Sequence, residues 1–157
     1  MTRPLKPGVS GHASFVTDEQ GVRVARLSLT RWWDDTLEIQ NGRPCGDRFR
    51  PLVVIGVNPS DACGEEDDNT SAKCTTYAKR EGANGLVMIN PHPGISLTPA
   101  SLASMLLPTG TDEANWAAVI VALGEDAVHV SAGWGKRPKK LASWPTRVAK
   151  VRSIAKQ

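Results

Sequence analysis

The sequence predicts an α/β fold with three layers, α/β/α, in which helices cover both faces of a short central parallel sheet. Three short apolar runs, 52–57, 85–89 and 127–132, have the continuous pattern typical of strands buried on both faces. Helical patterns lie between these runs, which favours parallel strands joined by right-handed crossovers. The 157 residues suffice for one domain. We expect it to span 13–157, after a flexible segment rich in Pro and Gly at 1–12.

An N-terminal pair of strands is expected beside this core. Residues 22–30 alternate in a way that suits an edge or antiparallel strand. The alternation places Arg26 and Thr30 on one face and Leu29 on the other. Ser14–Val16 is the candidate partner, so the sequence predicts an antiparallel strand or hairpin that joins the parallel strands.

Start and stop signals place helices between the apolar runs. Asn69 or Thr70 can cap a helix that continues to about Glu81, and Gly82 ends it. Thr98–Pro99 opens a short helix with proline in its first turn. These segments are therefore predicted as the first two helices.

Two further helices are expected toward the C-terminus. One spans 111–123, and its apolar positions Trp116, Ile120 and Leu123 are spaced for one buried face. The last begins near Trp144–Pro145, where proline again occupies the first turn. With them, the order of elements completes the α/β alternation.

Composition excludes several classes of protein. No apolar run approaches the roughly 18–20 residues that span a bilayer, and residues 1–7 lack the apolar region of a signal peptide. Three cysteines (Cys45, Cys63 and Cys74) are an odd number, which argues against a disulfide framework. Cys63, Cys74 and His92 match no structural zinc spacing. We therefore expect a cytoplasmic protein with no membrane contact, no metal and no other cofactor.

Basic residues gather at the C-terminal end. The segment 136–157 holds eight of them and no acid, although the net charge of the whole chain is only +3. A basic end on an acidic body is typical of a surface that faces a polyanion, and also of a solvated terminal helix. If this segment faces a polyanion, we expect the phosphate groups to be contacted by Lys136, Arg137, Lys139 and Lys140.

Unusual residues follow each apolar run. They are Asn58-Pro59-Ser60, Asn90-Pro91-His92 and Gly133-Trp134-Gly135. Ligands of open α/β sheets bind beyond the carboxyl ends of the strands, so we expect these three groups to converge on one rim. A single Asn-Pro is simply a turn signal. Two of them at equivalent positions favour a site.

The side chains of this rim suit a polar ligand. Asn58 and Asn90 each offer an amide oxygen and an NH2 group, which can orient a water or contact a polar edge. His92 can act as acid or base, since its ordinary pKa is about 6.5, or can lie at the surface. Trp134 can stack on a base or pack against the protein. His129, inside an apolar run, is expected in the core.

Through these residues the sequence resembles a bacterial and phage family, domain of unknown function 1643. The matching features, in order, are Leu29-Thr30-Arg31-Trp32, Asn58-Pro59-Ser60-x-Ala62, Asp68-x-Thr70, Cys74, Gly82, Gly85, Asn90, Thr98-Pro99-x-x-Leu102, Pro108-x-Gly110 and Trp134-Gly135. They extend over roughly residues 25–135 in consistent order. The resemblance carries little functional information, because the family is uncharacterised.

The order of strands and motifs is more distantly similar to the uracil-DNA glycosylase superfamily. There, a first strand ends in Asp-Pro or Asn-Pro, whose polar residue positions the attacking water, and Asn58 corresponds to it. A later strand ends in an Asn that contacts the base edge, which corresponds to Asn90. A third strand ends in Trp-Gly, as Trp134-Gly135 does. The resemblance implies a glycosylase-like fold and a pocket for an extruded base.

The leading hypothesis is a nucleic-acid- or nucleotide-directed protein with a glycosylase-like base-binding site, acting in DNA base excision or base modification. Asn58 and His92 would be its catalytic residues. Its substrate site would comprise Pro59, Ser60, Asn90, Trp134 and Gly135. The expected partner is DNA or a nucleotide.

Two alternatives remain open from the sequence. One is a non-catalytic module that binds nucleic acid or protein, such as a phage or mobile-element accessory protein. Asn58 cannot act as a general base, and the chain lacks the later His-Pro-Ser-like loop of the glycosylases, which favours this alternative. The other is an enzyme that acts on a free nucleotide or nucleoside. An exposed sheet edge further predicts a homodimer.

Overall fold

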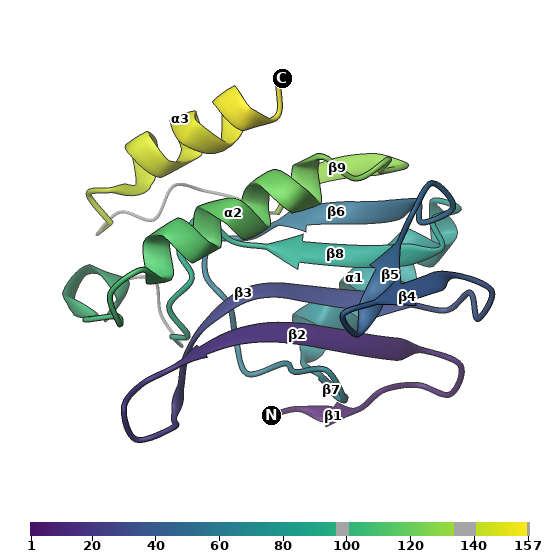
Figure 1. The fold of residues 1–157 in the computed structure, drawn as a ribbon, viewed down its shortest axis with the longest axis horizontal. Helices are drawn as coiled ribbons and strands as arrows, with labels where there is room; N and C mark the ends of the chain where they lie inside the picture. Colours follow the sequence, from purple (N-terminus) through teal and green to yellow (C-terminus); the bar gives the residue numbers. More distant parts are fainter. Residues whose placement is uncertain (97–100, 134–140, 157) are drawn as a thin grey trace.

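A computed structural model describes residues 1–96, 101–133 and 141–156 (Figure 1). Its centre is a five-stranded sheet with the strand order β2-β3-β8-β6-β9. The bounds are Ser10–Thr17 for β2, Arg23–Trp32 for β3, Pro51–Ile55 for β6, Gly85–Ile89 for β8 and His129–Ala132 for β9. Strands β6, β8 and β9 are parallel, and the β2–β3 hairpin joins them antiparallel to β8. The α/β class is confirmed, with a mixed sheet that is parallel only in part.

Helices cover both faces of this sheet (Figure 1). The α-helices of the described chain are α1 (Asn69–Arg80), α2 (Thr111–Leu123) and α3 (Trp144–Ile154), and Ser101–Ser104 forms the 3-10 helix η1. One core cluster joins the sheet to α2 and α3 and includes Val53, Ile55, Val87, Ile89, Trp116, Val119 and Val151. The other joins it to α1 and includes Leu29, Leu52, Val54, Ala78, Leu86 and Met88. Every residue of β6 and β8 is buried, because each strand lies between these two clusters.

The start of α1 is fixed by side chains just before the predicted caps. The N-cap is Asp68, whose carboxylate accepts a hydrogen bond from the Ser71 backbone N–H at 2.7 Å. The Ser71 hydroxyl in turn accepts one from the Asp68 backbone N–H at 3.0 Å, which completes a capping box. Asn69 therefore lies in the first turn. The helix end predicted at Gly82 is confirmed, since this residue adopts a left-handed φ of 78°.

Two small antiparallel sheets flank the centre. Strand β1 (Arg3–Pro4) pairs with β7 (Glu66–Asp67), and β4 (Glu38–Gln40) pairs with β5 (Arg43–Cys45). The first pair ties the N-terminal segment to the loop between β6 and α1. The flexibility expected of residues 1–12 stays a prediction, as does the domain boundary.

Strand β3 contains a bulge that changes which face its residues occupy. Phe15 pairs with Arg26 and Ser14 with Ser28, so Leu27 is an extra residue in this strand. Arg26 consequently reaches the α1 side of the sheet, where Leu29 also lies. The unbroken alternation expected from the sequence, with Arg26 opposite Leu29, is wrong at this point.

Three expectations about burial are also wrong. Strand β9 is an edge strand rather than one covered on both faces, and His129 is exposed rather than part of the core. In α2 the side chain of Ile120 is 55% exposed, while Val119 is buried. The helix start predicted at Thr98–Pro99 lies outside the described residues. No helix in the described ranges is long and apolar enough to cross a membrane.

Candidate functional site

The loops that follow β6 and β8 lie side by side at the carboxyl ends of the strands. The two strands run in register with Ile55 opposite Ile89. Beyond their last pair, the Gly56 N–H donates to the Ile89 carbonyl at 2.9 Å, and the His92 N–H donates to the Val57 carbonyl at 3.2 Å. The structure thus brings Asn58-Pro59-Ser60 and Asn90-Pro91-His92 to one rim. The neighbouring β9 reaches the same edge, where Gly133 donates to the Ile55 carbonyl at 2.8 Å.

Asn58 is half-buried, and its amide group has a defined orientation. Its Nδ2 donates to the backbone carbonyl of Ser96 at 2.7 Å and to that of Pro59 at 3.2 Å. Both partners are acceptors, so only the NH2 end of the amide can face them. The opposite end, Oδ1, is therefore directed away from these carbonyls as a free acceptor.

Asn90 is buried with an unmet hydrogen-bonding group. The residue is only 3% exposed, and its Nδ2 has no hydrogen-bond partner among the described residues. Its backbone carbonyl accepts a hydrogen bond from Asn115 Nδ2 at 3.1 Å, while Asn115 Oδ1 is itself buried without a partner. Buried polar groups are nearly always paired, and those that are not call for an explanation.

Gly56 provides the space that the Asn90 side chain occupies. A Cβ atom at position 56 would lie 2.4 Å from Asn90 Oδ1, closer than any non-bonded contact allows. Only glycine therefore permits this arrangement of the two loops. The amide of Asn90 thus lies against the backbone of the β6 loop.

His92 lines a cavity of about 230 Å³ together with Asp112, Ser143 and Arg147. Its ring stacks on that of Trp144 with the centroids 6.2 Å apart, and its Nε2 lies 3.5 Å from the Ser143 hydroxyl. Burial, reinforced by the charge of Arg147, lowers the pKa of His92 to about 4. The imidazole is consequently neutral at neutral pH.

Arg147 is itself committed to the protein. It forms an ion pair with Asp112 and donates from Nε to the Pro91 carbonyl. The carboxylate of Asp112 also accepts a hydrogen bond from Trp116 Nε1 at 3.1 Å. Burial would raise the pKa of Asp112, but the hydrogen bond and charge of Arg147 hold it below its usual value. The charges around His92 are therefore balanced.

Ser60 hydrogen bonds to the carboxylate of Asp68. Burial would raise the pKa of Asp68, yet the hydrogen bonds from Ser60 and Ser71 and the charge of Arg26 lower it overall. A carboxylate stabilised in this way is a weak proton acceptor. Pro59, between Asn58 and Ser60, is buried.

Two buried arginines of β3 hold the loop between β6 and α1, and sequence reasoning did not identify them as part of the site. Arg26 donates from Nη1 to the carbonyls of Ser60 at 3.2 Å and Ala62 at 2.8 Å. Burial lowers the pKa of Arg26 to about 10, so it remains charged at neutral pH. The signal available in the sequence is that Arg26 and Arg31 lie within a strand that is followed by the apolar run of the sheet core.

Arg31 is fully buried and holds the same loop farther along. Its Nε forms an ion pair with Asp67 Oδ1 at 3.0 Å, and its Nη2 donates to the carbonyls of Cys63 at 2.7 Å and Glu66 at 2.8 Å. The guanidinium thus binds side chain and backbone at once, a geometry that lysine cannot reproduce.

No cluster of three or more His, Cys, Asp or Glu side chains that could hold a metal ion occurs among the described residues. The three cysteines are free thiols. Burial, reinforced by the charge of Asp68, raises the pKa of Cys74, which disfavours the thiolate that zinc requires. Of the carboxylates in the loop between β6 and α1, Asp67 is committed to Arg31 and Asp68 to the start of α1.

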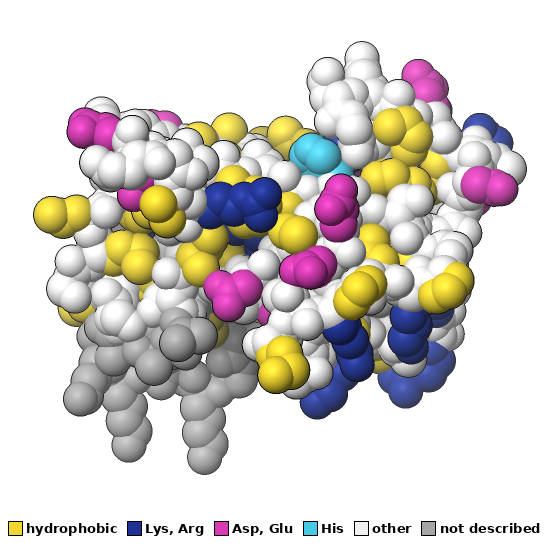
Figure 2. Space-filling model, turned by 90° about the horizontal axis from the view of Figure 1, so that it is seen from below, with side chains coloured by type: hydrophobic (Ala, Val, Ile, Leu, Met, Phe, Trp, Pro, Cys, Tyr) yellow, Lys and Arg dark blue, Asp and Glu magenta, His cyan; other side chains and the backbone are white. Residues whose placement is uncertain are grey.

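Several predicted site residues lie outside the described residues. They are Trp134, Gly135, Lys136, Arg137, Lys139 and Lys140. Their roles in stacking and phosphate contact stay predictions. On the face seen from the β2 side, Figure 2 shows Lys and Arg side chains interspersed with Asp, Glu and apolar residues. This face presents charge of mixed sign.

Comparison with known proteins identifies a family for most of the chain. The model described as "Protein of unknown function (DUF1643)" matches residues 26–157. Neither the curated proteins nor the solved structures yield a match. The matched region includes both arginines and all of the rim, whereas β1 and β2 precede it.

Proposed function

The chain belongs to the DUF1643 family of proteins of unknown function, and we propose that its rim is a base-binding site of a nucleic-acid- or nucleotide-directed protein. In this proposal the ligand presents a nucleobase to the loops that follow β6 and β8. The likeness in motif order to uracil-DNA glycosylases supports the proposal, since those enzymes bind an extruded base at the corresponding edge.

The buried amide of Asn90 is the observation that carries this proposal. An NH2 group without a partner is an unmet donor, and carbonyl oxygens on base edges are the acceptors that such a group binds. Leaving a donor buried and unpaired costs about 1–3 kcal/mol. A ligand that supplies the missing acceptor recovers this free energy, provided that it displaces the groups that cover Asn90.

Asn58 is suited to hold a water beside the bound base. Its Nδ2 is committed to two backbone carbonyls, which orients Oδ1 as an acceptor. An amide oxygen can position a water but cannot take its proton. Asn58 would therefore orient the water toward C1′ of the sugar, where a C1′–O bond forms as the C1′–N bond to the base breaks. The departing base and the solvent take up the proton that the water loses, because Asn58 does not act as a general base.

A second candidate, binding without catalysis, is favoured by the proton chemistry of the rim. With a pKa of about 4, His92 is neutral at neutral pH and is a weak base. The one histidine of the described rim is thus poorly suited to accept a proton near pH 7. His92 would then contribute a neutral hydrogen-bonding group to a recognition surface.

Measurements on one set of DNA strands can distinguish binding from catalysis. Fluorescence anisotropy would measure the affinity for labelled single- and double-stranded DNA, with and without uracil, as salt is raised. A phosphate-contacting protein loses affinity steeply with salt. Strand scission after alkali would identify base excision, and binding without scission would favour the non-catalytic module.

The decisive variant is Asn90→Ala, with Asn84→Ala as the matched control. Asn84 precedes β8 at the opposite end of the strand, where it bonds to the backbone of Arg48 and Arg50. We expect Asn90→Ala to abolish discrimination between bases while non-specific affinity stays near that of the wild type. Asn84→Ala should preserve discrimination. Equal discrimination by wild type and Asn90→Ala would remove Asn90 from the site.

The predicted homodimer also stays a proposal. Strands β2 and β9 form the two edges of the sheet, and Val128 and Val130 beside and within β9 are 37% and 43% exposed. An unpaired strand edge with apolar side chains favours pairing with another chain. Sedimentation at high concentration tests this, and a monomer there would contradict it.

A further inference from the structure

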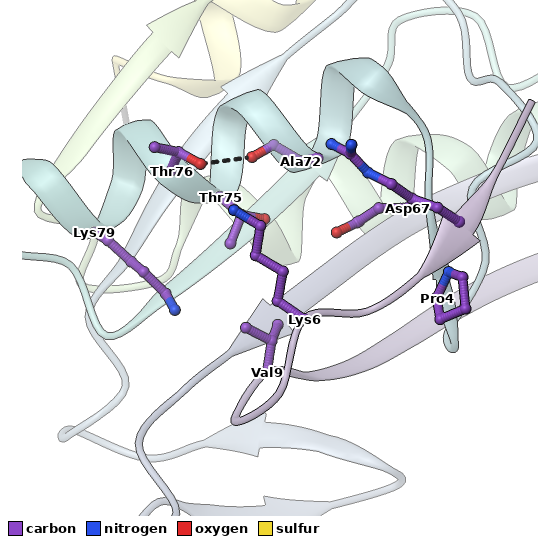
Figure 3. Close-up of a pocket in the computed structure, with 9 residues that line it drawn as sticks. Pro4, Lys6, Val9, Asp67, Ala72, Thr75, Thr76 and Lys79 are labelled. Carbon is purple, nitrogen blue, oxygen red and sulfur yellow. Dashed lines mark hydrogen bonds between the residues drawn. The ribbon is translucent and has the colours of Figure 1, made fainter.

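A second cavity lies between the N-terminal segment and the outer side of α1, apart from the rim. Its volume is about 260 Å³. Figure 3 shows Lys6 and Val9 of the N-terminal segment approaching it from one side, and Thr75, Thr76 and Lys79 of α1 bordering it on the other. None of the residues predicted for the rim lines this cavity.

The lining of this cavity carries a positive charge that the protein does not neutralise. Arg3, Lys6 and Lys79 line it, and within the described ranges none of them forms an ion pair with a carboxylate. The only acidic lining residue, Asp67, is already paired with Arg31. Three cations therefore surround a space with no free counter-charge, which favours an anionic ligand.

The rest of the wall is mainly apolar or has its donors occupied. The Thr75 hydroxyl donates to the Ser71 carbonyl at 2.9 Å, and that of Thr76 donates to the Ala72 carbonyl at 3.0 Å. Pro4, Val9 and Ala72 provide apolar surface. Lys79 Nζ lies over the Trp33 ring, 5.0 Å from its centroid, a contact that does not neutralise its charge. The positive side chains can thus bind the anionic group, and the apolar wall accommodates a compact apolar body.

The N-terminal wall is fixed to the core rather than merely lying near it. Strand β1 pairs with β7 so that Arg3 lies opposite Asp67. The Leu5 N–H donates to the Glu65 carbonyl at 3.2 Å, and the Thr2 hydroxyl donates to Glu66 Oε2 at 2.7 Å. The family match covers α1 but begins after this wall, at residue 26. The cavity thus combines the matched region with a segment that precedes it.

We propose that this cavity binds a small organic anion, in which a phosphate or carboxylate group is joined to a compact apolar body. Lys6 and Lys79 contact the anionic group from opposite sides, and Val9 and Ala72 contact the apolar part. The proposal is independent of base binding at the rim.

Isothermal titration of the full chain with phenyl phosphate tests the proposal, and benzoate distinguishes a carboxylate from a phosphate ligand. Inorganic phosphate carries only the charge, and phenol only the ring. We expect phenyl phosphate or benzoate to bind at least about tenfold more tightly than either fragment, because both parts contribute. Equal affinity for inorganic phosphate and phenyl phosphate, or no binding of either organic anion, would overturn the proposal.

Variants of single lysines locate the site. Lys79→Met and Lys6→Met keep the length of the side chain but remove its charge, and each should weaken binding about tenfold or more. Lys73→Met is the matched control, since Lys73 is an exposed residue of α1 that does not line the cavity. Equal weakening in all three variants would indicate attraction to net charge alone and would contradict the assignment.

A third variant fills the cavity instead of changing its charge. Thr76 is exposed and lines the cavity, so Thr76→Tyr should fold normally and abolish binding of the organic anion. Asn90→Ala should bind it like the wild type, which keeps this test distinct from that of the rim. Undiminished binding by a folded Thr76→Tyr variant would overturn the placement of the ligand.

Discussion

The loops after β6 and β8 share one rim but satisfy their polar groups in opposite ways. The loop from β6 to α1 has its backbone carbonyls held by Arg26 and Arg31, and its two aspartates next to α1 are hydrogen bonded. The loop after β8 contains Asn90, whose amide donor is buried without a partner, and His92, which is neutral and enclosed. The β6 loop is therefore held by two buried arginines, although Arg26 Nε has no partner among the described residues, whereas the β8 loop has no such charged support at Asn90.

This difference separates structural polar residues from those available to a ligand. A fully paired buried charge stabilises one conformation but has no capacity left for another molecule. A buried donor without a partner destabilises the free protein, and it is the group that the proposed ligand would satisfy. We accordingly expect the largest stability effects where Arg31 holds the β6 loop, and the functional effects at Asn90 in the β8 loop and at Asn58.

The largest effect is expected from Arg31→Ala. This substitution leaves the Asp67 carboxylate buried without its partner and removes two bonds to backbone carbonyls, which should lower the free energy of unfolding by about 3–5 kcal/mol. Urea denaturation measures it. Arg23→Ala, which removes an arginine from the exposed start of the same strand, is the control. Similar losses for both variants would show that Arg31 does not brace the loop.

The second-largest effect is a loss of folding stability at acidic pH, which we expect from His92 in the β8 loop. Folded protein keeps His92 neutral down to about pH 4, whereas an unfolded His binds a proton near pH 6.5. Between these values the unfolded state binds more protons, so stability is complete above pH 6.5 and decreases as the pH falls toward 4. The expected loss is on the order of 3 kcal/mol. His92→Gln should remove this part of the decrease.

The free energy of unfolding at pH 7 and pH 4.5 tests this expectation by urea titration. His129→Gln is the control for loss of an imidazole, because His129 lies on the exposed edge strand β9. The wild type and His129→Gln should lose more stability on acidification than His92→Gln. An equal loss in all three proteins would contradict the enclosed, neutral state of His92.

Much of the fold was predictable because local signals and tertiary packing agree. The apolar runs 52–57 and 85–89 became β6 and β8, and Gly82 ends its helix as expected. Prediction from the local sequence was wrong where tertiary packing determines which side chains are buried. In α2 the residues around Ile120 are apolar on all sides, so the buried face depends on how the helix lies on the sheet. An edge position, as for β9, is likewise a property of strand order.

The position of the candidate site could be predicted from the sequence, but the side-chain contacts that hold its loops could not. Asn58 and Asn90 follow parallel strands, so topology alone brings their loops together. Arg26 was not predicted to hold the loop because the bulge at Leu27 moves its side chain to the other face of the sheet. A bulge cannot be recognised from the alternation of apolar and polar residues alone. The burial of Asn90 involves Gly56 and Asn115, which lie far from one another in sequence, so no local pattern indicates it.

The smallest effect probes the contact between the two loops. In Gly56→Ala the new Cβ would lie 2.4 Å from Asn90 Oδ1, so the amide must move within a packed surrounding. We expect a loss of about 1–3 kcal/mol in the free energy of unfolding. Gly133→Ala is the matched control, because this glycine follows the neighbouring strand β9 and its Cβ would meet no atom closer than 3.4 Å.

The double variant Gly56→Ala/Asn90→Ala tells whether the clash with Asn90 is the cause. Asn90→Ala removes an amide whose donor has no partner, so by itself it should change stability little. It also opens the space that the new methyl group needs, and the double variant should recover most of the stability that Gly56→Ala loses. If the double variant instead loses as much stability as the two single variants together, the clash with Asn90 is not the cause of the loss in Gly56→Ala. The Asn90 side chain would then be able to move away from the new methyl group without cost. Its buried, unpaired amide would no longer distinguish the β8 loop from the β6 loop.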